Sequence, residues 1–451
     1  MEEQGRTENG AYRPDDTTVM KSSFDDEESG SFSLTANFQL QFIEATSRYE
    51  ILDGLGEGGV GTVYRARDRD LGREVAVKVL LPKHLGNPDL IRRFSNESKI
   101  IGYLQHPGIA HVYQSGNCAD GRPFYVMKLV DGETLADLLK QHEEGTVSLS
   151  RLLRVFSDVC QAIAYTHSCG IIHLDLKPRN VMVGAFGEVH VMDWGLANSV
   201  RAEVSKLIGL HSEATHFGDV VQLNMDYKTS IRGTLPYMSP EMARGERVGR
   251  AADIFGLGAI LCEILTGSPP FSGKSKREMF RHALVGEMGD ALASLAATDS
   301  DSALVRLAKR CLAPLAEDRP ESAHELVAEL SSYNECALSR MESDMSRFFD
   351  LSLDLFCIAG FDGYFRRINS NFTKILGFPE AVLLATPFID LVHRDDREKT
   401  IQQMSVLEEG KPVVRFRNRY LSAAGDYVEF EWTAKSIPEE NIIFAVARNV
   451  T

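Results

Sequence analysis

The sequence predicts an α+β protein in which a strand-rich segment is followed by a helical one, and then by a smaller α+β domain with an antiparallel sheet. A glycine-rich segment at 54–61 lies between short runs with the twofold apolar alternation of strands. Segments with helical apolar spacing follow, and 149–168 is the clearest of them. Beyond residue 353 strand patterns return, with short helices between them.

Length and composition indicate a soluble globular protein of two or three domains. The chain has 451 residues, of which 43% are hydrophobic and 25% charged. A net charge of −15 argues against nucleic-acid binding. The seven cysteines include no Cys-x-x-Cys pair, which argues against disulfides or zinc and favours a cytoplasmic location. The apolar stretch 254–265 is interrupted by Glu263 and is too short to span a bilayer, so we expect no membrane association.

The first predicted segment is a disordered acidic tail over residues 1–45. Residues 1–30 are acidic and poor in large apolar side chains, with an acidic run at 25–28. Such a segment buries too little apolar surface to offset the entropy lost on ordering.

Residues 56–61 have the form G-x-G-x-x-G, in which backbone N–H groups can approach phosphate oxygens without a Cβ in the way. Alone, this pattern also fits the start of a dinucleotide-binding helix. The residues that follow favour two strands instead, at 62–66 and 74–80. The second strand carries a single lysine, Lys78. A helix is predicted over 92–104, with Glu97 among its apolar residues.

The segment 173–180 has the clearest chemistry. The Asp175 carboxylate can orient or accept the proton of an attacking hydroxyl, Lys177 can neutralise phosphate charge, and Asn180 can hold a metal ion. Asp193 adds a second carboxylate on a turn before Gly195. This order of groups suits phosphoryl transfer, whereas the structural alternative is a polar turn between a helix and a strand.

Together these segments resemble the protein kinase family over residues 48–332, and in particular bacterial serine/threonine kinases of the eukaryotic type. The resemblance implies a two-lobed fold with a β-rich N-lobe and an α-rich C-lobe. It implies that ATP and Mg²⁺ are cofactors, with Asn180 and Asp193 as the metal ligands. The nucleotide contacts that it implies are Leu55, Gly56, Glu57, Gly58, Gly59, Val60, Gly61, Thr62, Val63, Ala76, Lys78, Met127, Leu129 and Met182.

The catalytic residues implied by the resemblance are Asp175, Lys177, Lys78, Glu97 and Thr234. Glu97 is expected to hold Lys78 against the ATP phosphates. Thr234 is expected to bond to Asp175 and Lys177, and so to favour a Ser/Thr hydroxyl as the acceptor.

Three further residues are expected to be structural. His173 is predicted to be a packed histidine bonded to nearby backbone, and Asp253 is predicted to brace the catalytic loop near it. Arg319 is expected to pair with Glu241.

Two departures from the family pattern bear on regulation. Leu174 replaces an arginine that receives an activation-segment phosphate in most kinases, and leucine cannot pair with phosphate. We therefore expect that phosphorylation of this segment is not the main on-switch. Trp194 replaces phenylalanine, and we expect retained activity. The extra stretch at 199–226 lacks a periodic pattern, although Thr229 and Ser230 further on are candidate phosphosites.

A linker helix is predicted over 333–347, within a helical pattern at 331–350. Apolar residues there are spaced 3-4-3, which fits either a short coiled-coil seam for a homodimer or a packed connector. The order β-β-α-α-α-β-β-β that follows resembles a PAS domain, an α+β fold with an antiparallel sheet, over 348–451. We expect no covalent cofactor there, because no cysteine lies in a flavin-adduct motif, and we expect His393 to be a capping or surface histidine rather than a haem ligand.

The sequence thus predicts a serine/threonine protein kinase that acts on protein substrates and is regulated or dimerised through its PAS domain. The alternative is a nucleotide-binding pseudokinase scaffold that recruits partners through the PAS domain. Lys78, Asp175 and Asp193 are all present, and this favours the enzyme.

Overall fold

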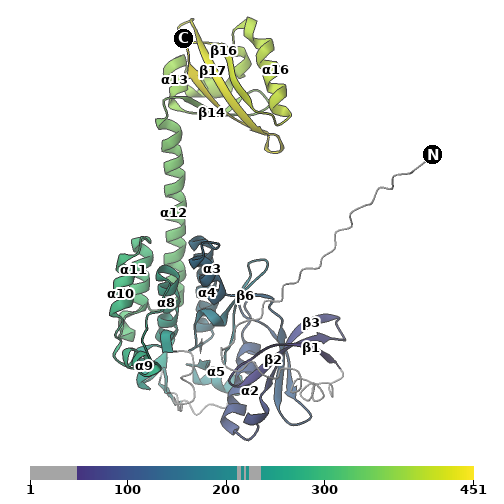
Figure 1. Cartoon of the computed structure of the whole chain (residues 1–451), viewed down its shortest axis with the longest axis vertical. Helices are drawn as coiled ribbons and strands as arrows, with labels where there is room; N and C mark the ends of the chain where they lie inside the picture. The colour runs from purple at the N-terminus through teal and green to yellow at the C-terminus, as the bar shows by residue number, and fades with distance from the viewer. Residues whose placement is uncertain (1–47, 211–214, 218–219, 223–234) are drawn as a thin grey trace, which may run out of the picture. The chain divides into compact units, whose positions relative to one another are not determined.

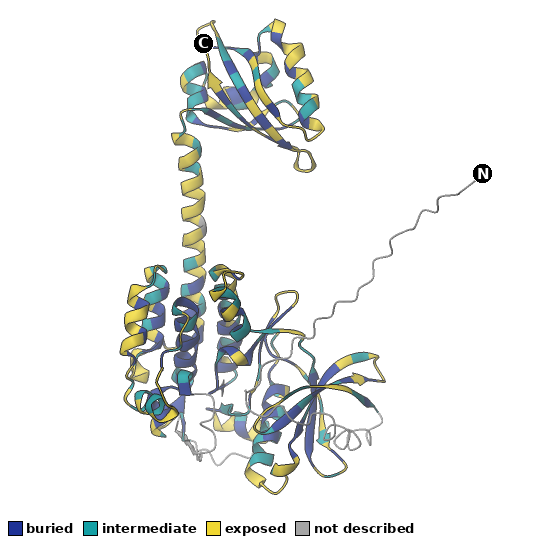
Figure 2. Cartoon of the chain, viewed as in Figure 1, coloured by how far each residue is buried: buried dark blue, intermediate teal, exposed yellow. Residues whose placement is uncertain are grey.

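The computed structural model describes residues 48–210, 215–217, 220–222 and 235–451. The predicted tail and the residues Thr229, Ser230 and Thr234 lie outside these ranges. Contacts divide the chain into two compact units, one ending at Tyr333 and the other beginning at Asn334. Each unit has its own five-stranded sheet and its own hydrophobic core (Figures 1 and 2).

The first unit begins with a five-stranded antiparallel sheet in the order β1-β2-β3-β5-β4 (Figure 1). Its strands are β1 Tyr49–Glu57, β2 Gly61–Asp68, β3 Arg73–Leu80, β4 Val112–Asn117 and β5 Pro123–Lys128. Helix α2, Pro88–Tyr103, contacts β4 and β5. It begins earlier than predicted, because the side chain of Asn87 accepts hydrogen bonds from two amides of the first turn. Pro88, at the first helical position, has no N–H group that would need an acceptor.

The rest of this unit is mainly helical, and α8, Arg250–Thr266, is buried along almost its whole length (Figure 2). Two glycines of α8 permit close packing. A Cβ at Gly256 would lie 2.9 Å from Leu176 Cβ, and one at Gly258 would lie 2.5 Å from Cys311 Cβ. Further helices of this unit are α3 Leu135–Glu143, α4 Leu149–Ser168, α7 Pro240–Arg244, α9 Lys276–Val285, α10 Gly289–Ala297 and α11 Ser302–Cys311. The prediction for α4 is confirmed.

Short strands position the loops of this unit. The sheet β6-β8-β9 consists of Gly132–Thr134, Val181–Gly184 and Val189–Val191, and β7 Ile171–Ile172 pairs with β10 Asn198–Ser199. Within the stretch that showed no periodic pattern lie α5 Ala202–Leu207, β11 Thr215–Phe217 and β12 Val220–Gln222. Strand β12 pairs with β13, Val248–Gly249, so this stretch is held by residues distant in sequence. Short 3₁₀ turns are η2 Pro82–His84, η3 Pro178–Asn180, η4 Leu235–Tyr237 and η5 Ala316–Asp318.

A single helix, α12 Ala323–Leu351, contains the predicted linker and begins before it. The second unit then has a five-stranded antiparallel sheet in the order β15-β14-β18-β17-β16 (Figure 1). Its strands are β14 Leu355–Ala359, β15 Phe365–Ile368, β16 Val413–Leu421, β17 Tyr427–Ile437 and β18 Ile442–Asn449. Its helices are α13 Ser370–Leu376, α14 Glu380–Ala385, α15 Phe388–Leu391 and α16 Arg397–Glu408, with 3₁₀ turns η6 Arg394–Asp396 and η7 Pro438–Glu440. The predicted order of the five strands is confirmed, but four α-helices lie between β15 and β16 where three were predicted.

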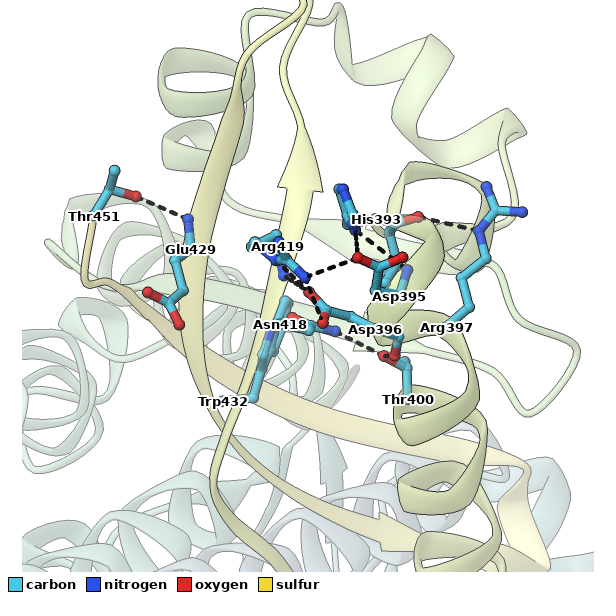
Figure 3. Close-up of polar contacts among 11 residues, drawn as sticks. His393, Asp395, Asp396, Arg397, Thr400, Asn418, Arg419, Glu429, Trp432 and Thr451 are labelled. Atoms are coloured by element: carbon cyan, nitrogen blue, oxygen red, sulfur yellow. Dashed lines mark hydrogen bonds and ion pairs between the residues drawn. The ribbon is translucent and has the colours of Figure 1, made fainter.

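A chain of hydrogen bonds joins α16 to the sheet of the second unit (Figure 3). The indole of Trp432 donates to Asn418 Oδ1 at 2.7 Å, and the Asn418 amide donates to Thr400 Oγ1 at 3.0 Å. Arg419 forms a two-pronged ion pair with Asp396 next to this chain. His393 accepts from the Asp395 amide at the start of η6, which confirms its predicted capping role.

Candidate active site

The glycine-rich segment forms the hairpin between β1 and β2. The Gly58 amide donates to Gly61 O at 2.9 Å and closes the turn. A Cβ at Gly61 would lie 2.8 Å from the carbonyl oxygen of Val79, so this position requires glycine. A Cβ at Gly59 would meet nothing within 4 Å. The backbone therefore has open space on that side, where phosphate oxygens could approach it.

Strand pairing brings most of the predicted nucleotide contacts together. Val63 on β2 pairs with Lys78 on β3, and Ala76 on β3 pairs with Met127 on β5. Leu129 follows β5 directly, and Met182 lies on β8. The remaining predicted contacts, Leu55–Thr62, all lie on the β1–β2 hairpin.

The predicted pair of Lys78 and Glu97 is present. Lys78 Nζ donates to Glu97 Oε1 at 2.7 Å and to Oε2 at 3.0 Å. Burial opposes the charge on Lys78, but Glu97 outweighs it, so the pKa of Lys78 lies well above its ordinary value. Because Glu97 is on α2 and Lys78 is on β3, the pair fixes the helix against the sheet.

As predicted, Asp253 on helix α8 stabilises the catalytic loop, residues 173–180. Asp253 accepts from the backbone N–H groups of His173 at 2.8 Å and Leu174 at 2.7 Å, and from His167 Nε2 at 2.8 Å. His173 Nε2 lies 3.0 Å from Met192 O, which confirms its predicted bond to backbone. Leu174 has φ of +67°, a left-handed conformation that non-glycine residues rarely adopt. The two bonds to Asp253 therefore hold the loop in a conformation that its sequence disfavours.

The functional groups of this loop face one another. Lys177 Nζ donates to Asp175 Oδ2 at 2.8 Å. The Asn180 amide nitrogen donates to Asp175 O at 2.8 Å and to Oδ2 at 3.1 Å, which leaves its oxygen for another ligand. Burial raises the pKa of Asp175 above its ordinary value, although Lys177 opposes the shift. A buried carboxylate with a raised pKa is suited to accept a proton.

Asp193 differs from Asp175 in its environment. Its side chain is half-exposed, and its Oδ1 lies 3.8 Å from Lys78 Nζ. Desolvation would raise the pKa of Asp193, but the charges of Lys78 and Lys177 lower it overall. Asp193 therefore stays ionised. With the Asn180 oxygen it offers the hard oxygen donors that Mg²⁺ prefers.

The two departures from the family pattern lie in the core. Leu174 and Trp194 are both buried in the main hydrophobic cluster of the first unit. The Trp194 indole donates to Val191 O at 3.1 Å, and its ring lies 4.5 Å from that of His173 in an edge-on arrangement. The larger aromatic ring is thus accommodated directly beside the catalytic loop.

The predicted structural ion pair is present. Arg319 Nη1 and Nη2 donate to the two carboxylate oxygens of Glu241 at 2.7 and 2.8 Å. Both side chains are buried, and they join the start of α7 to the segment before α12. Thr234, the fifth predicted catalytic residue, lies outside the described residues.

Sequence reasoning missed one feature beside the catalytic loop. A cavity of about 230 Å³ is lined by α3, Lys177, Arg179, Tyr237 and Glu263. The Tyr237 hydroxyl donates to Glu263 at 2.7 Å. The signal was present, because Glu263 is the only charged residue in the apolar stretch 254–265.

Comparison with known families agrees with this geometry. The sequence model of the protein kinase domain matches residues 49–330. The chain belongs to the protein kinase family. A second model, that of the PAS fold, matches residues 365–446 of this kinase chain.

Several relatives of this kinase carry curated names. It is 40% identical over 233 residues to serine/threonine-protein kinase PknB of Mycobacterium tuberculosis, a match covering 51% of this chain and 34% of the relative. It is 31% identical over 299 residues to serine/threonine-protein kinase PknD of Protochlamydia amoebophila, covering 64% of this chain and 30% of the relative. The chain thus spans about a third of the length of these relatives. Among the described residues, no helix of this kinase has the length and apolar character needed to cross a membrane.

Proposed function

We propose that the chain is a serine/threonine protein kinase that transfers the γ-phosphate of ATP to Ser and Thr hydroxyls of proteins. One observation carries this proposal: the Lys78–Glu97 pair is formed, and Asp193 lies within 3.8 Å of the same lysine. Phosphoryl transfer depends on positioned charges, and these three residues supply them. The serine/threonine names of the relatives support the choice of acceptor.

The residues take the following roles in this proposal. The turn between β1 and β2 and Lys78 bind the phosphates, while Val63, Ala76, Met127, Leu129 and Met182 contact the adenine. Asp175 accepts the proton of the attacking hydroxyl, and Lys177 neutralises charge on the transferred phosphate. Asn180 and Asp193 would hold Mg²⁺, which bridges and neutralises the phosphates when bound. Thr234 is assigned to acceptor choice by its position in the sequence alone.

Incubation of the full chain with labelled ATP and Mg²⁺ tests the proposal. The wild type should label itself or a general protein substrate, whereas Asp175→Asn and Asp193→Ala should not. Nucleotide binding without label in the wild type would favour the scaffold alternative.

We also propose a cytoplasmic protein with a kinase domain at 48–332, a linker helix at 333–347 and a PAS domain at 348–451. The boundary between the two compact units at 333/334 supports this division. The seven cysteines are free thiols, which suits a reducing compartment.

Finally, we propose that the linker helix and PAS domain form a homodimer that regulates the kinase. Met341, Met345 and Phe348 lie on one face of α12 and are 67%, 62% and 69% exposed. A second copy presents the same apolar face, so the contact can be self-complementary. The ring of Phe348 also lies 6.2 Å from that of Phe356 on β14, which extends this face to the sheet.

Sedimentation of Met345→Glu with Phe348→Glu tests the dimer. We expect a monomer for this double variant and a dimer for the wild type. Ser343→Glu, on the opposite side of the same exposed helix, is the control and should remain dimeric. A wild-type chain that sediments as a monomer at all concentrations would contradict this proposal.

A further inference from the structure

A lysine and a buried histidine join two strands beside the proposed nucleotide site. Lys128 is the last residue of β5, and its Nζ lies 3.1 Å from Nε2 of His190. His190 lies in the middle of β9 and is only 2% exposed. The sequence predicted that residues 128–130 contact the adenine through their backbone, but it predicted no role for the Lys128 side chain or for His190.

The two residues adjoin proposed adenine contacts on two different strands, which we treat as the two walls of that site. Lys128 lies between Met127 and Leu129, which are the proposed adenine contacts of the strand end. His190 is the register partner of Met182, the proposed contact on the other side. Directly opposed residues of an antiparallel pair project from the same face, so His190 and Met182 face the same way. The hydrogen bond therefore connects the two walls directly.

The chemistry of the pair fixes its protonation. An ammonium group only donates hydrogen bonds, so Nε2 of His190 must accept and the ring must be neutral, with its proton on Nδ1. Burial, together with the charge of Lys128, lowers the pKa of His190 to about 4. Glu188 opposes this shift and His111 adds to it, so the ring is neutral near pH 7.

This arrangement does not maximise stability. Nδ1 of His190 is buried and has no hydrogen-bond partner in the part of the chain that the structure describes. An unsatisfied buried donor is destabilising, and apolar residues of similar size would fill such a place at least as well. The benefit of the pair must then lie in the geometry that it imposes.

We propose that Lys128 and His190 are positioning residues, which set the spacing between the two walls of the adenine site. This inference rests on the proposed function, since it assumes that ATP binds there. The pair acts on nucleotide affinity rather than on the transfer step, because it does not include the groups around Asp175.

A double-mutant cycle on the full chain tests the inference, with Lys128→Met, His190→Leu and both together. The dissociation constant of ATP is measured by calorimetry, KM and kcat by transfer assay, and stability by thermal unfolding. We expect each single variant to weaken ATP binding about tenfold, the size expected for one hydrogen bond to a charged group. The double variant should bind ATP no more weakly than either single variant and should unfold at no lower temperature than the wild type. Its KM should change more than its kcat.

Two further variants sharpen the test. His190→Gln keeps an acceptor for Lys128 and should bind ATP like the wild type. Lys276→Met, at an exposed lysine of α9, is the matched control for loss of a charge. If ATP affinity is unchanged in all variants, or if the losses of affinity add in the double variant, this inference is wrong but the proposed function is unaffected. A wild-type chain that does not bind ATP would overturn the proposed function as well.

Discussion

The ammonium nitrogen of Lys78 lies 2.7 Å from the Glu97 carboxylate and 3.8 Å from that of Asp193. One cation on β3 is therefore shared between the helix α2 and the turn that carries the proposed metal ligand. The three residues come from separate segments of the first unit. Their proximity therefore shows that the sheet, the helix α2 and the turn at Asp193 pack together at this site.

Replacing Lys78 with methionine should remove transfer activity and lower stability. The change leaves the Glu97 carboxylate buried without a cation, which costs about 3 kcal/mol, and removes a proposed phosphate contact. We expect transfer to fall at least about 100-fold. Activity assays and urea unfolding measure the two effects. Glu97→Gln is the control. It also breaks the ion pair, but Lys78 keeps Asp193 at 3.8 Å as a counter-charge, so it should lose activity with a smaller loss of stability.

Replacing Arg319 should lower stability without a direct effect on phosphoryl transfer. Its side chain is fully buried against Glu241, so Arg319→Met leaves a buried carboxylate and should lower the free energy of unfolding by about 3–5 kcal/mol. The double variant with Glu241→Met should recover much of that loss. Urea unfolding measures both. A single variant as stable as the wild type would show that the pair contributes little.

Activation-segment phosphorylation should not control the wild-type enzyme. Leu174 is buried among apolar side chains and offers no charge to a phosphate. Phosphatase treatment should therefore leave wild-type activity unchanged. In Leu174→Arg, a phosphate can provide the partner that the new cation lacks, and phosphorylation should raise activity about tenfold, as for one charge-assisted hydrogen bond. If this variant gains no dependence on phosphorylation, the interpretation of Leu174 is wrong.

Stability should fall as the pH is lowered from about 6.5 to about 4. The pKa of His190 is about 4 in the folded chain, against an ordinary value of 6.5, so the unfolded chain binds the extra proton in this range. The loss should be on the order of 3 kcal/mol. Urea unfolding at a series of pH values measures the slope, and His190→Gln should lack this part of it. An equal slope in both proteins would contradict a buried neutral His190.

Much of the fold could be predicted because the informative patterns are local. The glycines at 56–61, the apolar spacing of α4 and the alternation of β16 and β17 each reflect the conformation of their own segment. The same holds for Asp175, Lys177 and Asn180, which one loop brings together. The pairing of Lys78 with Glu97 could be expected only because the surrounding motifs resemble a known family.

Other features depend on contacts between distant segments. Strand β12 lies in a stretch without periodicity, and its partner β13 becomes available only when the chain folds. The Lys128–His190 bond joins residues 62 positions apart, and nothing in the segment around His190 predicts this partner. By itself the sequence determined the strands and helices with a clear local pattern and the groups available for phosphoryl transfer. The tertiary structure alone decided which buried polar groups meet, because their hydrogen bonds depend on the packing of separate segments in one core.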